Sequence, residues 1–384
     1  MQKPGQKIKR KSKVTNDISK DTRGFYFAIG CCLIIFAILL FALPHLLKNL
    51  ENPNTIREQQ AALGLHVNGN KLLNGKGQEV ILHGVDRSGT EYQCIKGTNK
   101  IFDGPSDQAS IQAMKSWKIN VVRIPLNEDC WLGINEASPS GQIYQQAISN
   151  YVKLLDQNHL YVILDLHWNA PGTTKATGQQ VMADADHSFT FWTSVGNTFK
   201  GNQNIIFDLY NEPHDISWSC WQVGMNCNTP FTVANIQDLV NTVRGTGANN
   251  VLMIGGLEYA NDLSGWIANR PTDGINNIVA SWHMYGKNRC ATKECWDKTI
   301  APVMAQVPVI AGEFGESTDG GVCDKNTNLS NSFMNWMDQH HSGYLAWTWD
   351  TWGTDCGNLS LITDYKGTPK SPNGTNYQNH LEQF

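Results

Sequence analysis

The run YVILDLH at residues 161–167 is apolar until it ends in a polar group, and runs of this kind recur along the chain. The others are VILHGVD (80–86), NVVRIPL (120–126), NIIFDLYNEP (204–213), VLMIGG (251–256), IVASWHMY (278–285), VPVIAGEFG (307–315) and GYLAWTWD (343–350). Near-continuous apolar runs are typical of strands buried on both faces, as in a parallel sheet that helices cover. The chain therefore has eight candidate strands of one sheet.

Amphipathic segments lie between these runs. Residues 107–118 place Ile111, Met114 and Trp117 on one helical face, and residues 142–157 do the same with Ile148, Val152 and Leu155. Eight alternations of strand and helix predict an α/β fold, a closed (β/α)8 TIM barrel, with an open doubly wound sheet as the alternative. Asn-Gly pairs at 68–69 and 74–75 predict a short N-terminal hairpin before the first barrel strand.

The N-terminal segment has a different composition. Residues 25–47 form a 23-residue apolar stretch that would span about 34 Å as a helix, enough to cross a bilayer. Eight Lys and Arg precede it, so the positive-inside rule puts the N-terminus in the cytoplasm. We expect a basic cytoplasmic tail (1–24), a single transmembrane signal anchor (25–47), a linker (48–60) and a barrel domain (61–384).

This reading predicts a membrane-anchored protein with an extracytoplasmic barrel, or a secreted one if the segment is a signal peptide that is cleaved. The 41% apolar and 10% aromatic composition excludes a disordered chain. Eight of the 30 basic residues lie in the tail, so acidic residues outnumber basic ones in the rest of the chain. This charge balance excludes a nucleic-acid partner. We expect a monomer.

Eight cysteines lie after the apolar stretch, and an even number in an oxidising compartment predicts disulfides. The short intervals Cys220–Cys227 and Cys290–Cys295 predict two local pairs, and Cys94 with Cys130 and Cys323 with Cys356 would complete four. No zinc-site spacing is present, so we expect no metal.

The residues that end each run decide the chemistry, because a barrel collects its functional groups at the C-terminal ends of its strands. They include Asp86 and Arg87, Arg123, His167 with Trp168, Asn211 and Glu212, His283 and Tyr285, Glu313, Trp347 and Trp349. Each alone has a structural explanation, such as a buried ion pair or a core histidine. Their convergence on one rim predicts a site.

Glu212 and Glu313 end the fourth and seventh runs, which lie on opposite sides of the barrel mouth. Two carboxylates that face each other across a substrate are the arrangement of glycoside hydrolysis, and a separation of about 5–5.5 Å marks the retaining type.

These motifs resemble glycoside hydrolase family 5, the retaining cellulase family of clan A barrels, over about residues 62–384. The similar positions are Arg123 in VVRIP, His167 in LDLHW, Asn211-Glu212-Pro213, His283-x-Tyr285, Glu313 in GEFG, and Trp347 in WTWD. The resemblance implies a catalytic acid/base at Glu212 and a nucleophile at Glu313. It also implies a substrate-binding set: Arg123, His167, Trp168, Asn211, His283, Tyr285, Trp347 and, as an alternative stacking platform, Trp349.

The resemblance implies a retaining endo-β-1,4-glucanase, a cellulase that acts on a β-linked polysaccharide without a cofactor. The residues leave open an endo-β-mannanase, an enzyme for xyloglucan or mixed-linkage glucan, and a non-catalytic carbohydrate-binding barrel. A metal-dependent hydrolase that uses His167 and His283 is a further alternative, although neither H-E-x-x-H nor H-x-H is present.

Overall fold

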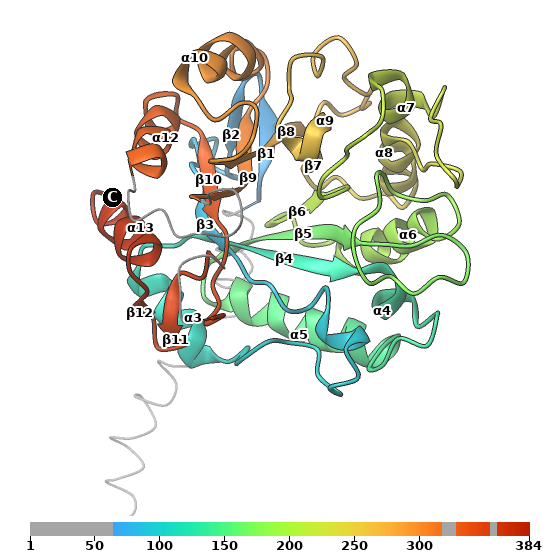
Figure 1. The fold of residues 1–384 in the computed structure, drawn as a ribbon, viewed down its shortest axis with the longest axis horizontal. Coiled ribbons are helices and arrows are strands. Elements are labelled where there is room, and N and C mark those ends of the chain that lie inside the picture. Colours follow the sequence, from blue (N-terminus) through green and yellow to red (C-terminus); the bar gives the residue numbers. More distant parts are fainter. Residues whose placement is uncertain (1–63, 317–327, 354–358) are drawn as a thin grey trace, which may run out of the picture. The chain divides into compact units, whose positions relative to one another are not determined.

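The computed structural model describes residues 64–316, 328–353 and 359–384, and these residues contain a closed barrel of eight parallel strands (Figure 1). In chain order the strands are β3 (His83–Asp86), β4 (Val121–Asn127), β5 (Tyr161–Trp168), β6 (Ile205–Asp208), β7 (Leu252–Gly255), β8 (Ile278–Tyr285), β9 (Val309–Gly315) and β10 (Gly343–Ala346). Each pairs with the next, and β10 closes on β3. The predicted barrel is confirmed, and the open sheet is wrong.

Helices cover the outside of the barrel (Figure 1). They are η1 (Gln93–Ile95), α3 (Gln108–Ser116), α4 (Glu128–Leu132), α5 (Gln142–Gln157), α6 (Ser188–Phe199), α7 (Trp218–Val223), α8 (Ile236–Gly245), α9 (Leu257–Ala260), α10 (Lys293–Cys295), η2 (Trp296–Ile300), α11 (Ala301–Met304), α12 (Asn328–Gln339) and α13 (Asn373–Leu381). Residues 142–157 form a helix with the predicted bounds. Helix α3 begins after Asp107, whose side chain accepts a hydrogen bond from the Ser110 amide.

Side chains alternate along each strand between the barrel interior and the helices. On β5, Val162, Leu164 and Leu166 belong to the core beneath the helices, whereas Tyr161 and Ile163 pack inside the barrel. The next inward positions of the same register carry Asp165 and His167, which therefore stand at the C-terminal end of the barrel. One strand thus supplies apolar filling at one end and polar groups at the other.

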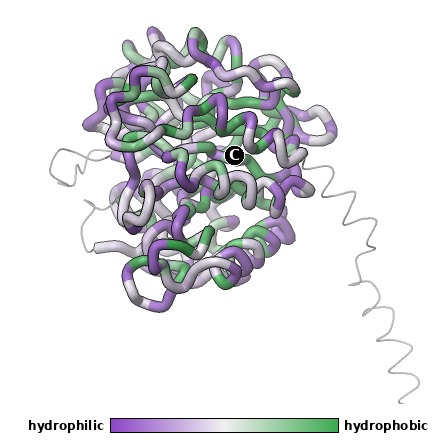
Figure 2. The backbone as a smooth tube through the Cα atoms, turned by 90° about the vertical axis from the view of Figure 1, so that its right-hand side faces the viewer, coloured by the Kyte–Doolittle hydropathy of each residue, from purple (hydrophilic) through white to green (hydrophobic). Residues whose placement is uncertain are grey.

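The N-terminal end of the barrel is apolar and closed. Val121, Ile163, Ile206 and other inward residues form one cluster with Leu65 and Leu72 of the N-terminal segment. Strands β1 (His66–Asn68) and β2 (Lys71–Leu73) pair as the predicted antiparallel hairpin. Figure 2 shows hydrophobic segments running through the interior and hydrophilic segments at the periphery. The polar side chains of the barrel interior therefore lie at its C-terminal end.

Three of the expected disulfides are present: Cys94–Cys130, Cys220–Cys227 and Cys290–Cys295. Cys323 and Cys356 lie outside the described residues, as do the predicted tail, membrane segment and linker at 1–60. Among the helices of the described ranges, none is long and apolar enough to cross a bilayer. Near the C-terminus, β11 (Ile362–Asp364) pairs with β12 (Thr368–Pro369) ahead of α13.

Candidate active site

A pocket of about 750 Å³ lies at the C-terminal ends of the barrel strands. Predicted residues that line it are His167, Trp168, Asn211, Glu212, Tyr285, Glu313 and Trp347. Arg123 and His283 are fully buried directly beneath this lining. The barrel therefore brings nine of the ten predicted catalytic and substrate-binding residues to one place.

Arg123 is the centre of the charge network below the pocket. Its guanidinium lies 2.9 Å from an oxygen of Asp86, 3.1 Å from Asp165, 3.0 Å from Asp208 and 2.7 Å from Glu313. Burial opposes a charge on Arg123, but these four carboxylates outweigh it and raise the Arg123 pKa well above its ordinary value. One permanent cation therefore holds several strand ends together.

Glu313 is held as an anion by its surroundings. The Tyr285 hydroxyl donates to Oε2 at 2.7 Å, and the Arg123 guanidinium contacts Oε1. Burial acts to raise the pKa of Glu313, yet the charges of His283, Arg123 and His167, with the Tyr285 hydrogen bond, lower it to about 2. A buried carboxylate that stays ionised at neutral pH can serve as a nucleophile.

Glu212 has a more open environment, and its side chain is 16% exposed. His283 Nδ1 lies 2.9 Å from Oε1, and the Gln179 amide donates to Oε2 at 2.9 Å. Asn211 is fixed from two sides, since it accepts from Arg123 at 2.9 Å and donates to Gln179 at 2.7 Å. Both oxygens of Glu212 are thus oriented by neighbouring side chains, while the residue faces the pocket.

The two glutamates lie close together. One carboxylate oxygen of Glu212, one of Glu313 and one ring nitrogen of His283 all lie within 4.8 Å of one another. An inverting pair would need about 6.5–9.5 Å between carboxyl groups to admit a water, whereas a retaining pair stands about 5–5.5 Å apart. The geometry fits the retaining arrangement.

His167 and Trp347 form one side of the pocket. Their rings stack at 5.6 Å with an interplanar angle of 11°. Asp165 accepts from His167 Nδ1 at 2.6 Å; burial opposes the charged imidazole, but Asp165 outweighs it and raises the His167 pKa. Trp168 is half-buried beside them and also faces the pocket. Flat apolar faces of this kind suit the faces of sugar rings.

Trp349 does not lie at the rim, so its predicted role as a stacking platform is wrong. It is fully buried and packs edge-on against Trp117, with ring centroids 4.9 Å apart. Strand β10 ends at Ala346, and beyond it the chain turns so that the Trp349 amide donates to the Asp86 carbonyl. The alternation that would place Trp349 beside Trp347 stops with the strand.

The pocket also has lining residues outside the ten predicted ones, from the loops and from α9: Glu91, Tyr92, Gln179, Glu258, Tyr259, Asn261, Lys287, Asn288, Arg289, Trp352 and Leu359. Tyr259 is 44% exposed, and its ring stacks on His214 at 4.3 Å. Residues 258–260 all have positive φ, with 61° at Tyr259, a backbone that L-residues rarely adopt in succession. Glu, Tyr and Ala are not residues that favour this backbone, so the sequence gives no signal for it here.

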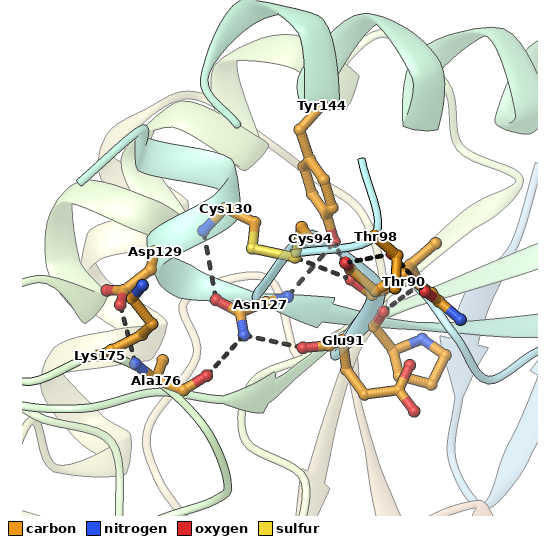
Figure 3. Close-up of a disulfide and its surroundings, with 12 residues drawn as sticks. Thr90, Glu91, Cys94, Thr98, Asn127, Asp129, Cys130, Tyr144, Lys175 and Ala176 are labelled. Atoms are coloured by element: carbon orange, nitrogen blue, oxygen red, sulfur yellow. Dashed lines mark hydrogen bonds between the residues drawn. A yellow bond between two sulfur atoms is a disulfide. The ribbon is translucent and has the colours of Figure 1, made fainter. Parts of the chain in front are cut away.

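Glu91 is carried by the loop that follows β3, and Figure 3 shows how this loop is fixed. The Cys94–Cys130 disulfide joins it to α4, and the Asn127 amide donates to the carbonyls of Glu91 and Ala176 at 2.7 and 2.9 Å. One asparagine therefore joins the β3–α3 loop to the β5–α6 loop, and both loops line the pocket.

Two groups among the described residues have donor atoms close enough to hold a metal ion. One is Glu212, His283 and Glu313, where the recorded hydrogen bonds already occupy the carboxylate oxygens. The other is Glu128, Asp184 and His187, which lies outside the pocket lining.

Comparisons with known proteins agree with this geometry. Residues 73–353 match the family model Cellulase (glycosyl hydrolase family 5). The chain is 24% identical to a mannan endo-1,4-beta-mannosidase of Streptomyces lividans, over 87% of this chain and 78% of that protein. It is also 24% identical to Endoglucanase A of Butyrivibrio fibrisolvens, over 78% of this chain and 63% of that protein.

Among solved structures, a beta-glucanase from Saccharophagus degradans superposes with a TM-score of 0.66 at 19% identity. The match covers 83% of this chain and 93% of that one. The family match spans most of the barrel and includes every strand from β3 to β10. The chain therefore belongs to glycosyl hydrolase family 5 and is a glycosidase.

Proposed function

We propose that this enzyme is a retaining endo-β-1,4-glucanase that hydrolyses polysaccharide by double displacement. The observation that carries the proposal is the close pair Glu212 and Glu313, of which Glu313 is held ionised. The environments of the two carboxylates differ as the two roles require, because a nucleophile must be an anion and an acid/base must exchange a proton with substrate and water.

In the first step, a Glu313 oxygen attacks the anomeric carbon of the sugar while Glu212 gives its proton to the departing glycosidic oxygen. A covalent glycosyl ester forms and the shortened chain leaves with that proton. Tyr285 donates to the other Glu313 oxygen, so it keeps the nucleophile oriented.

In the second step, Glu212 takes a proton from a water molecule, and that water attacks the anomeric carbon of the ester. The bond to Glu313 breaks, the free carboxylate returns, and two inversions give net retention. Gln179 and His283 hold the two Glu212 oxygens in the same orientation during both steps.

The choice of glucan is supported by similar proteins named endoglucanases, from Microbulbifer, Butyrivibrio and Streptomyces. An endo-β-mannanase is the second candidate, because three similar proteins are named mannan endo-1,4-beta-mannosidases. Glucose and mannose differ in the orientation of the 2-hydroxyl, and we propose that this hydroxyl faces Asn211. The fixed Asn211 amide thus supports recognition of this hydroxyl in either sugar.

A product profile on carboxymethylcellulose, mannan, xyloglucan and mixed-linkage glucan tests the proposal. We expect a rapid fall in viscosity of carboxymethylcellulose with release of short oligosaccharides. Preferred cleavage of mannan would replace the glucanase by the mannanase. Binding without turnover on all four polymers would leave only a carbohydrate-binding barrel.

We further propose that residues 25–47 anchor the enzyme in the membrane with the barrel outside the cytoplasm. The three disulfides support this location, since such bonds persist in oxidising compartments. The test is extraction of membranes with alkaline carbonate, which should leave the full chain in the pellet. Recovery in the culture medium of a chain that begins after residue 47 would show cleavage instead.

A further inference from the structure

A second cluster of acidic and imidazole groups lies outside the active-site pocket. Glu128 is the first residue of α4, Asp184 lies in the loop between β5 and α6, and His187 precedes α6. Both carboxylates are fully buried, while the His187 side chain is 20% exposed. The cluster is therefore inside the protein but has one member that solvent reaches.

The distances from His187 Nδ1 to three oxygens are close to the ligand separations around one metal ion. His187 Nδ1 lies 3.6 Å from Asp184 Oδ1, 3.9 Å from Glu128 Oε1 and 3.3 Å from the Ala170 carbonyl oxygen. A tetrahedral ion with bonds of about 2.1 Å separates its ligands by about 3.4 Å. One imidazole nitrogen and three oxygens can therefore reach a single ion after small side-chain movements.

Both oxygens of Asp184 accept hydrogen bonds, from the Asn169 amide and the His187 backbone, but Glu128 is satisfied at one oxygen only. Ser188 donates to Glu128 Oε2 at 2.6 Å, but Glu128 Oε1, which is the oxygen nearest His187, is buried without a hydrogen-bond partner. Within the described residues, His187 is the one basic side chain at ion-pair distance from either carboxylate.

We propose that Glu128, Asp184 and His187, with the Ala170 carbonyl, bind one divalent cation of the Zn²⁺ or Mn²⁺ type. Imidazole with hard oxygen ligands suits these ions better than Ca²⁺ or Mg²⁺, which prefer oxygen alone. The ion neutralises the two buried carboxylates and satisfies the unpartnered oxygen. It is a structural ion, since the cluster does not line the active-site pocket.

The ion would fasten the β5–α6 loop to the end of β4. Asn169 donates to Asp184 at 2.8 Å and accepts from Tyr210 at 3.0 Å, so Asp184 is tied to the base of the same loop. This loop carries Gln179, which orients Glu212. The site thus stabilises the wall of the active-site pocket without contacting substrate.

The test is calorimetric titration of the full chain, purified in mild detergent without a histidine tag and stripped with a chelator. Zn²⁺ and Mn²⁺ are the probes, and Ca²⁺ and Mg²⁺ are the comparison ions. We expect saturable binding of Zn²⁺ or Mn²⁺, with one ion per chain bound at this cluster. The melting temperature should rise with the ion concentration. No saturable binding of either ion at millimolar concentration overturns the proposal, because a shared proton then bridges the carboxylates.

Variants assign the bound ion to the cluster. Glu128→Gln keeps the shape of the side chain, and His187→Gln changes the partly exposed ligand; each should weaken binding at least about 10-fold. His66→Gln, on the exposed edge of β1, is the matched control and should bind like the wild type. Glu313→Gln should keep the ion, because it alters only the other cluster. An ion lost in Glu313→Gln and retained in Glu128→Gln would contradict the assignment.

Discussion

Two buried glutamates line the same pocket, and their pKa values are shifted in opposite directions. Glu313 at the end of β9 is 4% exposed and has its pKa lowered to about 2. Glu91 in the β3–α3 loop is 2% exposed, and burial raises its pKa to about 7. Depth in the protein therefore does not decide which carboxyl is charged.

The difference lies in the partners. Glu313 receives hydrogen bonds from the Arg123 guanidinium and the Tyr285 hydroxyl, and both donors stand on barrel strands. Glu91 accepts from the Gly89 amide at 2.6 Å, and the more distant charges of His167 and Arg87 only partly offset its burial. Strand ends supply fixed cations, whereas the loop supplies backbone dipoles.

The largest effect should come from removing the charge of the catalytic pair. Glu313→Gln should reduce hydrolysis of every substrate by roughly 10⁴-fold or more, since no nucleophile remains. Glu212→Gln should reduce hydrolysis of unactivated polysaccharide by about 10²- to 10⁴-fold. Rate measurements on polysaccharide and on a dinitrophenyl glycoside check both expectations.

The leaving group separates the two roles. A dinitrophenolate departs without a proton, so Glu212→Gln should still release it in a burst that Glu313→Gln lacks. Circular dichroism should show both variants folded. Full activity of either variant on polysaccharide would falsify the assignment.

The second prediction concerns Arg123, the cation that contacts Glu313 and has no counterpart at Glu91 among the described residues. Arg123→Met leaves four carboxylates without their shared partner and should lower the free energy of unfolding by about 3–5 kcal/mol. Urea unfolding measures this. Arg244→Met removes an ion pair with Asp273 at the partly exposed end of α8 and is the matched control. Equal decreases in the free energy of unfolding of the two variants would show that burial of Arg123 among four carboxylates has no additional effect on stability.

The third prediction concerns pH and stability. Glu91 is protonated in the folded protein up to a pH of about 7 but in the unfolded chain only up to 4.5, so its contribution to stability falls as the pH rises between these values. At pH 8 the loss is at most about 3 kcal/mol. Glu91→Gln cannot ionise and so avoids this loss. The free energy of unfolding of the variant, relative to that of the wild type, should therefore be higher at pH 8 than at pH 4.

Glu313 should behave in the opposite way. Because its pKa is lowered in the folded protein, ionised Glu313 stabilises the fold above pH 4.5. This stabilisation is lost as the pH falls toward 2. Urea unfolding of wild type, Glu91→Gln and Glu313→Gln over this range compares the two groups. A Glu91→Gln effect that does not vary with pH would mean that Glu91 ionises like an ordinary surface glutamate.

The smallest effect should come from the loop side of Glu212. Gln179→Ala removes a hydrogen bond to a carboxylate, which contributes about 1.5–3 kcal/mol, so kcat/KM should fall about 10- to 100-fold with little change in melting temperature. Gln180→Ala is the control, because its recorded hydrogen bonds use the backbone. Equal activity of the two variants would show that Gln179 does not position Glu212.

The barrel and its strand-end residues could be predicted from the sequence, because the apolar runs recur regularly and the functional residues stand at their ends. Arg123, Glu212, Tyr285 and Glu313 follow apolar runs, and a parallel barrel places the ends of such runs at one mouth. The same reasoning was wrong for Trp349, because it assumed that the last run stays extended beyond Ala346.

The loop residues could not be predicted. Gln179 and Tyr259 reach the pocket through irregular backbone, and Glu91 reaches it through a loop fixed by the Cys94–Cys130 disulfide and Asn127 (Figure 3). These positions depend on contacts between segments far apart in the chain, for which the sequence has no periodic signal. The ionisation of Glu91 likewise depends on burial that only the fold reveals.

Trapping of the covalent intermediate tests the central assignment most directly. The full chain is incubated with dinitrophenyl 2-deoxy-2-fluoro glycosides of cellobiose and of the corresponding manno-configured disaccharide, and peptides are sequenced by mass spectrometry. We predict a single label on Glu313, with the reactive sugar reporting the substrate class. A label on Glu212 or on another residue would contradict the role of Glu313 as the nucleophile.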